Sequence, residues 1–235
     1  MIRAHLTSRV EHGRSLPLLL WRFAGPTYVA STASAGGGLG TRWWIANASV
    51  RDDYTRHDLD GHLAELAAAL DLSGRGVGML TAADVRRVRF AAVDGVTAEA
   101  TVGLTDPTWA ADPAAADAAV AGAAVAGAAV AGAAAVPATA PPPGTINIVA
   151  QLPARLTDAA LCNALCTATE AKAQALADAG VSGTGTPSDA VTLTCPVDGP
   201  AATFGGPRSS WGAPLARAVY QAVLSGALAW QEQAP

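Results

Sequence analysis

The feature that most constrains this chain is a run of nineteen residues from Ala118 to Val136, AAVAGAAVAGAAVAGAAAV, which contains no charged or polar side chain. Such a run is long enough to cross a bilayer as a helix only if most of its residues count as apolar. It contains no Leu, Ile or Phe, however, and Gly122, Gly127 and Gly132 interrupt it, whereas membrane insertion is driven by large apolar side chains. A valine at every fifth position also builds no continuous helical face. We therefore expect no membrane span and interpret residues 112–143, rich in Ala, Gly and Pro, as a low-complexity linker or insert.

The remaining composition excludes several classes of protein. The chain of 235 residues has a net charge of −4, and its densest basic cluster is Arg86-Arg87-x-Arg89, so nucleic-acid binding has no electrostatic support. The apolar run Leu16–Trp21 is only six residues long, which is too short for a secretory signal peptide. Three cysteines do not suggest a disulfide framework; they are Cys162, Cys166 and Cys195. We expect a cytoplasmic protein.

The two sides of the alanine-rich tract show a related order of parts. Each side has a strand-like run, then a helical run, then a glycine-rich phrase. The first side has Arg42–Val50, Asp58–Leu70 and Gly76–Val85, and the second has Gly144–Leu152, Thr157–Gly180 and Gly183–Val191. A final helix is expected over Pro214–Trp230. This order favours an α+β fold. We expect one domain over residues 1–235, with helices packed on a mixed β-sheet and two pseudo-repeated halves.

A glycine-rich loop is the first candidate site. The stretch STASAGGGLG runs from Ser31 to Gly40, and consecutive glycines let backbone N–H groups come close to a ligand, as in anion-binding nests and oxyanion holes. A loop for nucleoside triphosphates would require a lysine that this stretch lacks. The alternative is a flexible turn between two strands.

The second candidate is a polar stripe on the helix expected over Thr157–Gly180. Its members recur at spacings of 4, 3 and 4 and therefore share one face; they are Asn163, Thr167, Glu170 and Gln174. They are interpreted as lining a site, and the alternative is a solvated face. Lys172 is the only lysine in the chain, which hints that a compact, titratable ammonium is needed there. Glu170 and Lys172 lie about 200° apart on an ideal helix, so we do not expect them to form a pair.

The third candidate is the phrase GTGTPSDAV at Gly183–Val191. It places the hydroxyls of Thr184, Thr186 and Ser188 beside Asp189 in a tight turn, where a nucleophile or a water molecule could be held rigidly. The alternative is ordinary turn capping by Ser and Asp.

A metal site is not expected. Asp58, His62 and Glu65 have a spacing that could in principle ligate zinc, but the motif HExxH is absent. An exposed, charged first helical turn explains these residues and His57 more simply.

Nine pieces of the chain, taken in order, resemble the adenosylcobinamide amidohydrolase family of cobalamin salvage. They span residues from about Pro17 to Gly226 and are LLLWRF, STASAGGGLG, WIANASV, GVGMLTAADV, TVGLTDPTWAADP, PGTINIV, TATEAKAQAL, GTGTPSDAV and FGGPRSSWGAPLARAV. Each piece alone is only weakly specific for the family, whereas the nine pieces in this order are strongly specific. One departure is Ala48, which follows Asn47 where the family has a polar residue, so Ala48 is given no catalytic role.

The resemblance implies an amidohydrolase that acts on a linear amide. The reaction would cleave the amide joining the aminopropanol arm of adenosylcobinamide to the corrin ring, giving adenosylcobyric acid and (R)-1-aminopropan-2-ol. No cofactor is expected, because the cobalt belongs to the corrinoid substrate, and hydrolysis is expected to need no metal. A corrinoid is large and rimmed with amides, so its site calls for hydrogen-bonding groups on a broad concave surface rather than a cluster of charges.

Amide hydrolysis needs an activated nucleophile, stabilisation of an oxyanion and protonation of the leaving amine. We expect Glu170 or Asp189 to be the general base, acting on water or on the hydroxyl of Thr186 or Ser188, and Lys172 to be the proton donor or charge stabiliser. The remaining predicted site residues bind substrate, with backbone N–H groups of the three glycines forming the oxyanion hole and the two asparagines at strand ends holding the substrate amide. These residues are Ser31, Thr32, Gly36, Gly37, Gly38, Asn47, Thr81, Asn147, Asn163, Thr167 and Gln174.

Two other functions stay open at this point. A corrinoid-binding protein without turnover would use the same polar surface, and a hydrolase of a different amide would use the same catalytic phrases. A homo-oligomer is also open, because the six tryptophans could line a pocket or an interface as well as a core.

Overall fold

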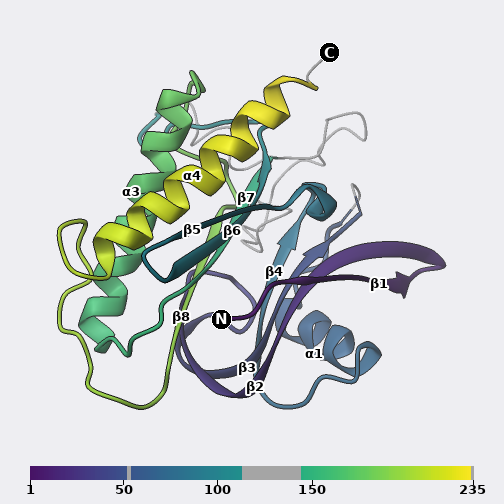
Figure 1. Cartoon of the computed structure of the whole chain (residues 1–235). Coiled ribbons are helices and arrows are strands. Elements are labelled where there is room, and N and C mark those ends of the chain that lie inside the picture. The colour runs from purple at the N-terminus through teal and green to yellow at the C-terminus, as the bar shows by residue number, and fades with distance from the viewer. Residues whose placement is uncertain (52–53, 113–143, 234–235) are drawn as a thin grey trace.

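The computed structural model describes residues 1–51, 54–112 and 144–233 of the chain (Figure 1). Its strands are β1 (His5–Glu11), β2 (Arg14–Ser31), β3 (Gly38–Ser49), β4 (Gly76–Thr81), β5 (Arg89–Val93), β6 (Val96–Gly103), β7 (Thr145–Gln151) and β8 (Ala190–Cys195). Its helices are α1 (Leu59–Ala69), the short 3-10 helix η1 (Val85–Arg87), α3 (Asp158–Asp178) and α4 (Gly212–Gln231). The predicted linker lies outside the described residues except for Asp112.

Within the described residues the strands form one mixed sheet with the order β4–β3–β2–β8–β7–β6–β5, and β1 pairs with the long strand β2. The pairs β3–β4 and β7–β8 are parallel, whereas β2 runs antiparallel to β1, β3 and β8. Helix α1 connects the first parallel pair and α3 connects the second. The mixed sheet with its helices confirms the predicted α+β class, and the same β-α-β connection occurs on each side of the tract.

The sheet bends so that its inner face closes on itself. Asn47 on β3 donates from Nδ2 to Thr101 Oγ1 on β6 at 2.9 Å, and Trp21 on β2 donates from Nε1 to Glu99 Oε2 on β6 at 2.6 Å. Neither pair of strands is adjacent in the sheet. The space between is filled by a buried cluster that includes Leu19, Ile45, Val77, Met79 and Val149. The fold therefore has two sheet halves face to face, with helices outside.

Alternation along the strands assigns each side chain to a layer. On β3, Trp44 and Ala46 pack with the α1 residue Leu66, while Ile45 between them belongs to the inner cluster. Strand β7 alternates in the same way and is buried over its whole length. A strand covered on both faces has few exposed positions, which explains why the sequence of β7 is mostly apolar.

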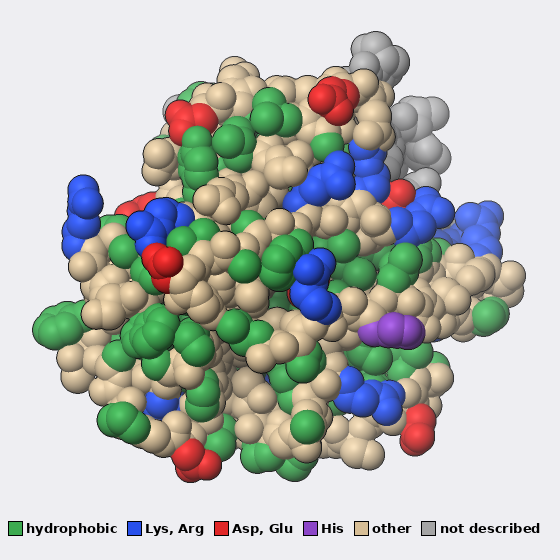
Figure 2. All heavy atoms as spheres, viewed as in Figure 1, with side chains coloured by type: hydrophobic (Ala, Val, Ile, Leu, Met, Phe, Trp, Pro, Cys, Tyr) green, Lys and Arg blue, Asp and Glu red, His purple; other side chains and the backbone are tan. Residues whose placement is uncertain are grey.

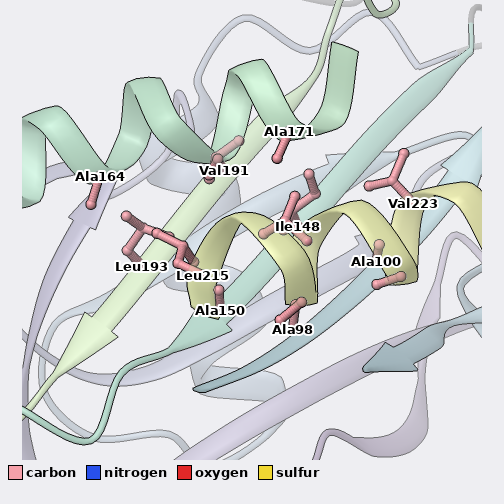
Figure 3. Close-up of a cluster of buried hydrophobic side chains, with 14 of the residues drawn as sticks. Ala98, Ala100, Ile148, Ala150, Ala164, Ala171, Val191, Leu193, Leu215 and Val223 are labelled. Atoms are coloured by element: carbon pink, nitrogen blue, oxygen red, sulfur yellow. The ribbon is translucent and has the colours of Figure 1, made fainter. Parts of the chain in front are cut away.

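The outer face of β5–β8 is covered by α3 and α4, which lie side by side across it (Figure 1). Both helices present small residues to the sheet, among them Ala164, Ala171 and Ala222, and larger side chains such as Ile148 and Leu215 fill the space between layers (Figure 3). Small side chains let helices and strands approach closely while the interior stays close-packed.

The first residues of the chain are tied to the inner face of β6 and β7. Gln151 accepts from Ile2 N at 3.0 Å and donates to Ile2 O at 2.5 Å. Glu99 is buried and accepts from Arg3 Nε at 3.0 Å as well as from Trp21. The N-terminal segment thus closes part of the inner space.

Most predicted elements are confirmed. Thr157 caps α3 through its side chain, which accepts from Ala160 N at 3.2 Å, and α4 begins at Gly212, two residues before the predicted start. The strands β1 and β2 were missed. The phrases GVGMLTAADV and GTGTPSDAV do not lie at matching places, because the first forms β4 and the turn after it while the second forms the turn before β8.

Within the described ranges, none of the helices is both long and apolar enough to span a membrane. On the face drawn in Figure 2, hydrophobic, basic and acidic side chains all reach the surface.

Candidate functional site

A cavity of about 150 Å³ lies between the two halves of the bent sheet. Its walls come from the β2–β3 loop, the start of α1, β4, β7 and the turn before β8. The polar residues that line it are Thr32, Ser34, Asn147, Ser188 and Asp189. Segments far apart in the sequence therefore bring hydroxyl, amide and carboxylate groups into one small space.

Asp189 anchors the turn before β8 through four hydrogen bonds. Its Oδ1 accepts from Ile146 N at 2.9 Å and from the Thr186 hydroxyl, and its Oδ2 accepts from Thr186 N at 3.1 Å and from Lys172 Nζ. The side chains of Lys172 and Asp189 are only 8% and 11% exposed. A buried charge is tolerated when it is paired and hydrogen-bonded, and these contacts fix the position of the Asp189 side chain in the turn.

Gly185 leaves the space for this ion pair. A Cβ atom at Gly185 would overlap both Lys172 Nζ and Asp189 Oδ2. The turn is also held from outside, because Thr108 N donates to Gly185 O at 2.8 Å and Thr184 N donates to Thr108 O at 2.9 Å. Gly185 thus serves close packing around the charged pair, whereas a Cβ atom at Gly183 would meet the Thr108 backbone.

Ser188 carries the hydroxyl of this turn that lines the cavity. Its Oγ lies 2.9 Å from Thr145 Oγ1 and 3.3 Å from the Gly144 carbonyl. A serine held by a second hydroxyl on one side has a fixed position and can present its oxygen to a ligand.

Two asparagines meet at the centre of the molecule. Asn147 on β7 donates from Nδ2 to Asn47 Oδ1 at 2.9 Å, and Asn47 in turn donates to Thr101. Asn147 is 2% exposed, and its Oδ1 is buried and has no hydrogen-bond partner within the described structure. Buried polar atoms are nearly always satisfied, so this oxygen marks a place for a ligand's donor.

The end of β2 forms another wall of the cavity. Ser31 Oγ lies 2.7 Å from Thr192 Oγ1 and accepts from Ala33 N at 3.1 Å. Thr32 lines the cavity, and its Oγ1 accepts from Val191 N at 2.9 Å. Both predicted residues therefore join β2 to β8 beside the cavity.

The three glycines of the β2–β3 loop lie behind the cavity wall, which is formed here by residues 32–35. Arg42 is buried and donates from Nε to Gly36 O at 2.8 Å and from Nη2 to Gly37 O at 2.7 Å. Burial, with a smaller effect of the Arg75 charge, lowers the pKa of Arg42. The arginine fixes the loop, and Gly38 begins β3.

The polar stripe of α3 divides between two environments. Thr167 is buried and donates to Gly205 O at 2.9 Å, whereas Glu170 and Gln174 are exposed on the face away from Lys172. Asn163 lines a second, open cavity of about 630 Å³ near the start of α4, together with Phe204 and other residues. The structure therefore does not bring Glu170 to Asp189.

Thr81 stands at the end of β4, where its Oγ1 accepts from Ala83 N at 2.9 Å. It is buried and does not line the cavity. Its hydrogen bond shows a capping role in the turn after the strand.

No three His, Cys, Asp or Glu side chains gather as a potential metal site within residues 1–51, 54–112 and 144–233. His62 is buried instead in hydrogen-bond contact with the Tyr54 hydroxyl at 2.7 Å, with its Nε2 3.4 Å from Glu11.

Sequence reasoning missed three polar residues around the cavity. Ser34 lines it, and Thr145 and Thr101 support Ser188 and the asparagines. Thr101 and Thr145 lie on strands whose inner face could have been read from the alternation of polar and apolar residues, since Asn147 shares that face with Glu99 and Thr101 through β6–β7 pairing.

The sequence model of the adenosylcobinamide amidohydrolase family matches residues 3–235. Two curated proteins named adenosylcobinamide amidohydrolase are also similar: one from Halobacterium salinarum is 45% identical over 83 residues, and one from Methanosarcina mazei is 37% identical over 92 residues.

Each of these two matches covers 35% of the chain, and they span 35% and 46% of the two relatives, respectively. The crystal structure of the PH0078 protein from Pyrococcus horikoshii is a looser likeness, with a TM-score of 0.44 at 11% identity over 98% of this chain and 84% of that protein.

Proposed function

Because the chain belongs to the adenosylcobinamide amidohydrolase family, we propose that it hydrolyses the amide joining the aminopropanol arm of adenosylcobinamide to the corrin ring. The products are adenosylcobyric acid and (R)-1-aminopropan-2-ol. Reuse of scavenged corrinoids is the role that this reaction serves.

The observation that carries the proposal is the convergence of four sequence pieces on one cavity. The pieces STASAGGGLG, GVGMLTAADV, PGTINIV and GTGTPSDAV each contribute residues to the cavity of about 150 Å³. They come from both sides of the alanine-rich tract, and each was singled out by the family resemblance. Hydroxyl, amide and carboxylate groups in one small space are the chemistry that amide hydrolysis requires.

Asp189 is the general base of the proposed reaction, since it is the one titratable side chain among the described residues that line the cavity. The attacking oxygen belongs to Ser188 or to a water molecule beside it, and Asp189 accepts the proton and returns it to the leaving amine. Lys172 holds the Asp189 side chain in place through their buried ion pair. Asn147 holds the substrate amide. The exposed position of Glu170 gives it no part in this scheme.

We also propose that no protein-bound metal takes part. Among the described residues that line the cavity, Asp189 is the one side chain of a type that commonly binds metal ions, and a protein-bound catalytic metal usually has three protein ligands. Turnover that persists after treatment with a chelator and is not increased by added zinc supports this part of the proposal; loss on chelation and recovery with metal contradicts it.

The direct test is incubation of the protein with adenosylcobinamide, followed by mass spectrometry of the corrinoid and amine products. Wild-type protein and Glu170→Gln should release both products at similar rates, and Asp189→Asn should lose at least about 10²-fold in kcat. Recovery of intact adenosylcobinamide from the wild-type reaction refutes the proposal and leaves a corrinoid-binding protein or a hydrolase of a different amide. A covalent acyl-enzyme in single-turnover experiments identifies Ser188 rather than water as the nucleophile.

A further inference from the structure

We propose that the cavity admits only the scissile amide and its short hydroxyalkyl arm, while the corrin ring stays outside, and that the buried Asn147 Oδ1 accepts the N–H of that amide. The enzyme therefore selects substrates by the N–H of the bond it cleaves and by the size of the arm. This inference rests on the proposed function and names the feature of the substrate that the site reads.

The size of the cavity supports the first part. Pockets that enclose drug-sized ligands have volumes of roughly 300–1,000 Å³, and this cavity has about 150 Å³. Hydrogen bonds join the loop in its wall to the neighbouring strands: Ala35 O on the β2–β3 loop accepts from Gly78 N of β4 at 3.0 Å, and Thr32 is bonded to Val191 of β8. A macrocycle larger than the cavity must remain at its mouth.

The orientation of Asn147 supports the second part. Its Nδ2 is committed to Asn47, and Asn47 Nδ2 is committed to Thr101. The chain of two bonds leaves Asn147 Oδ1 as a buried acceptor without a partner in the described structure, and the residue that carries it lines the cavity and is 2% exposed. A secondary amide offers one donor for this acceptor, and an ester or a tertiary amide offers none.

Two serine hydroxyls line other parts of the cavity, and most of the remaining lining residues are apolar. Ser34 and Ser188 are lining residues that can both donate and accept, so they suit the hydroxyl of the arm or the carbonyl oxygen of the amide. Asn147 is thus a positioning residue that orients the amide for attack from the side of Ser188 and Asp189.

The test compares three corrinoids with wild-type protein: adenosylcobinamide, the ester in which oxygen replaces the arm nitrogen, and the N-methyl amide. A site that hydrogen-bonds a substrate N–H rejects analogues without it strongly, so kcat/KM should fall by about 10²-fold or more for both analogues, although an ester is intrinsically easier to hydrolyse. An arm lengthened by a butyl chain should also be a poor substrate. Ester hydrolysis as efficient as that of the amide overturns the role of Asn147, and efficient cleavage of the long arm overturns the size limit.

A variant separates positioning from a structural role. Asn147→Ala should lower the amide-over-ester ratio toward one, whatever the fall in overall rate. Gln151→Leu is the matched control, because Gln151 lies on the same face of β7, is buried and hydrogen-bonds Ile2 away from the cavity; it should keep the wild-type ratio. An unchanged ratio in Asn147→Ala overturns the inference. Failure of wild-type protein to cleave adenosylcobinamide at all would instead refute the proposed function.

Discussion

The β3–α1–β4 unit and the β7–α3–β8 unit share their connectivity but differ in the turn that precedes the last strand. In the first unit this turn is short and packs under tryptophans: Trp44 Nε1 donates to Gly74 O at 3.2 Å, and a Cβ atom at Gly74 would overlap the Trp43 ring. In the second unit the turn is longer and encloses the buried pair of Lys172 and Asp189.

The ion pairs of the two units differ in burial. In the first unit Arg56 and Glu65 pair at the surface, with side chains 31% and 64% exposed. In the second unit both charges are buried. The same connection of strand, helix and strand thus serves as a packed support in one half and holds ionisable groups at the cavity in the other. Topology alone does not distinguish the two units; the turn before the last strand does, and it carries the proposed general base in the second unit only.

The largest effect is expected from breaking the buried pair. Lys172→Met leaves the Asp189 carboxylate without its ammonium and should lower the free energy of unfolding by about 3–5 kcal/mol, measured by denaturant titration. Arg56→Ala is the control in the other unit and should leave the denaturation midpoint unchanged, because its pair is exposed and screened. Equal midpoints for Lys172→Met and the wild type would show that the buried pair contributes nothing to stability and would remove the contrast between the units.

The next effect concerns the glycines of the two turns. Gly185→Ala pushes a methyl group between Lys172 and Asp189, and a small displacement of these proposed catalytic groups should lower kcat/KM by about 10–10²-fold. Gly74→Ala places a side chain at a φ of 76° against Trp43 and should cost roughly 1–2 kcal/mol of stability with kcat nearly unchanged. Steady-state kinetics and thermal unfolding of both variants are the measurements. A reversed outcome, with kcat lost only in Gly74→Ala, would place the chemistry in the first unit.

A smaller effect on stability is expected when the pH is lowered, through His62 of the first unit. Burial, only partly offset by the Glu11 charge and with added repulsion from Arg56 and Arg9, lowers the pKa of His62 below its usual 6.5. As pH falls through 6.5, the folded state binds fewer protons than the unfolded state. The contribution of neutral His62 to the free energy of unfolding is therefore fully present above that pH and is lost progressively below it. Thermal unfolding between pH 8 and pH 5 should show a decreasing midpoint, and His62→Gln, which keeps a group able to hydrogen-bond Tyr54, should reduce the slope. A steeper slope in the variant would contradict this assignment.

Local signals in the sequence predicted much of the fold. The cap at Thr157 fixed the start of α3, and the alternation in β3 and β7 marked strands with two different faces. The hairpin of β1 and β2 was missed because the run Leu16–Trp21 was considered only as the apolar core of a signal peptide and not as part of a strand. Its assignment depends on pairing with β3 and β8, which are distant in sequence.

The candidate site was predictable only in part, because local patterns identify single residues but not the contacts between distant segments. Asn47 and Asn147 were both predicted at strand ends, where they would hold the substrate amide. The structure places Asn47 near the end of β3 and Asn147 near the start of β7, and the two hydrogen-bond to each other across 100 residues of sequence. Lys172 and Asp189 were recognised separately, but nothing in the helical periodicity could join them, because the contact arises where α3 passes the turn before β8. Periodicity likewise showed that the polar stripe with Glu170 lies on one face of α3. It could not show whether that face is exposed or buried, because this depends on how α4 and β8 pack against α3.

The smallest effect is expected from removing Ala116–Ala140, which lie outside the described residues. The two units are held together by β2–β8 pairing and by the Asn47–Asn147 contact. Across the tract, β6 and β7 are antiparallel neighbours, with Gly103 paired to Thr145. The tract therefore joins strand ends that already lie together, and lengthening or shortening such a connection changes its closure entropy only slowly. The deletion variant should unfold near the wild-type temperature and keep near-normal turnover of adenosylcobinamide; a folded deletion variant without activity would mean that the tract contributes to the site, and the two units could no longer be treated as complete without it.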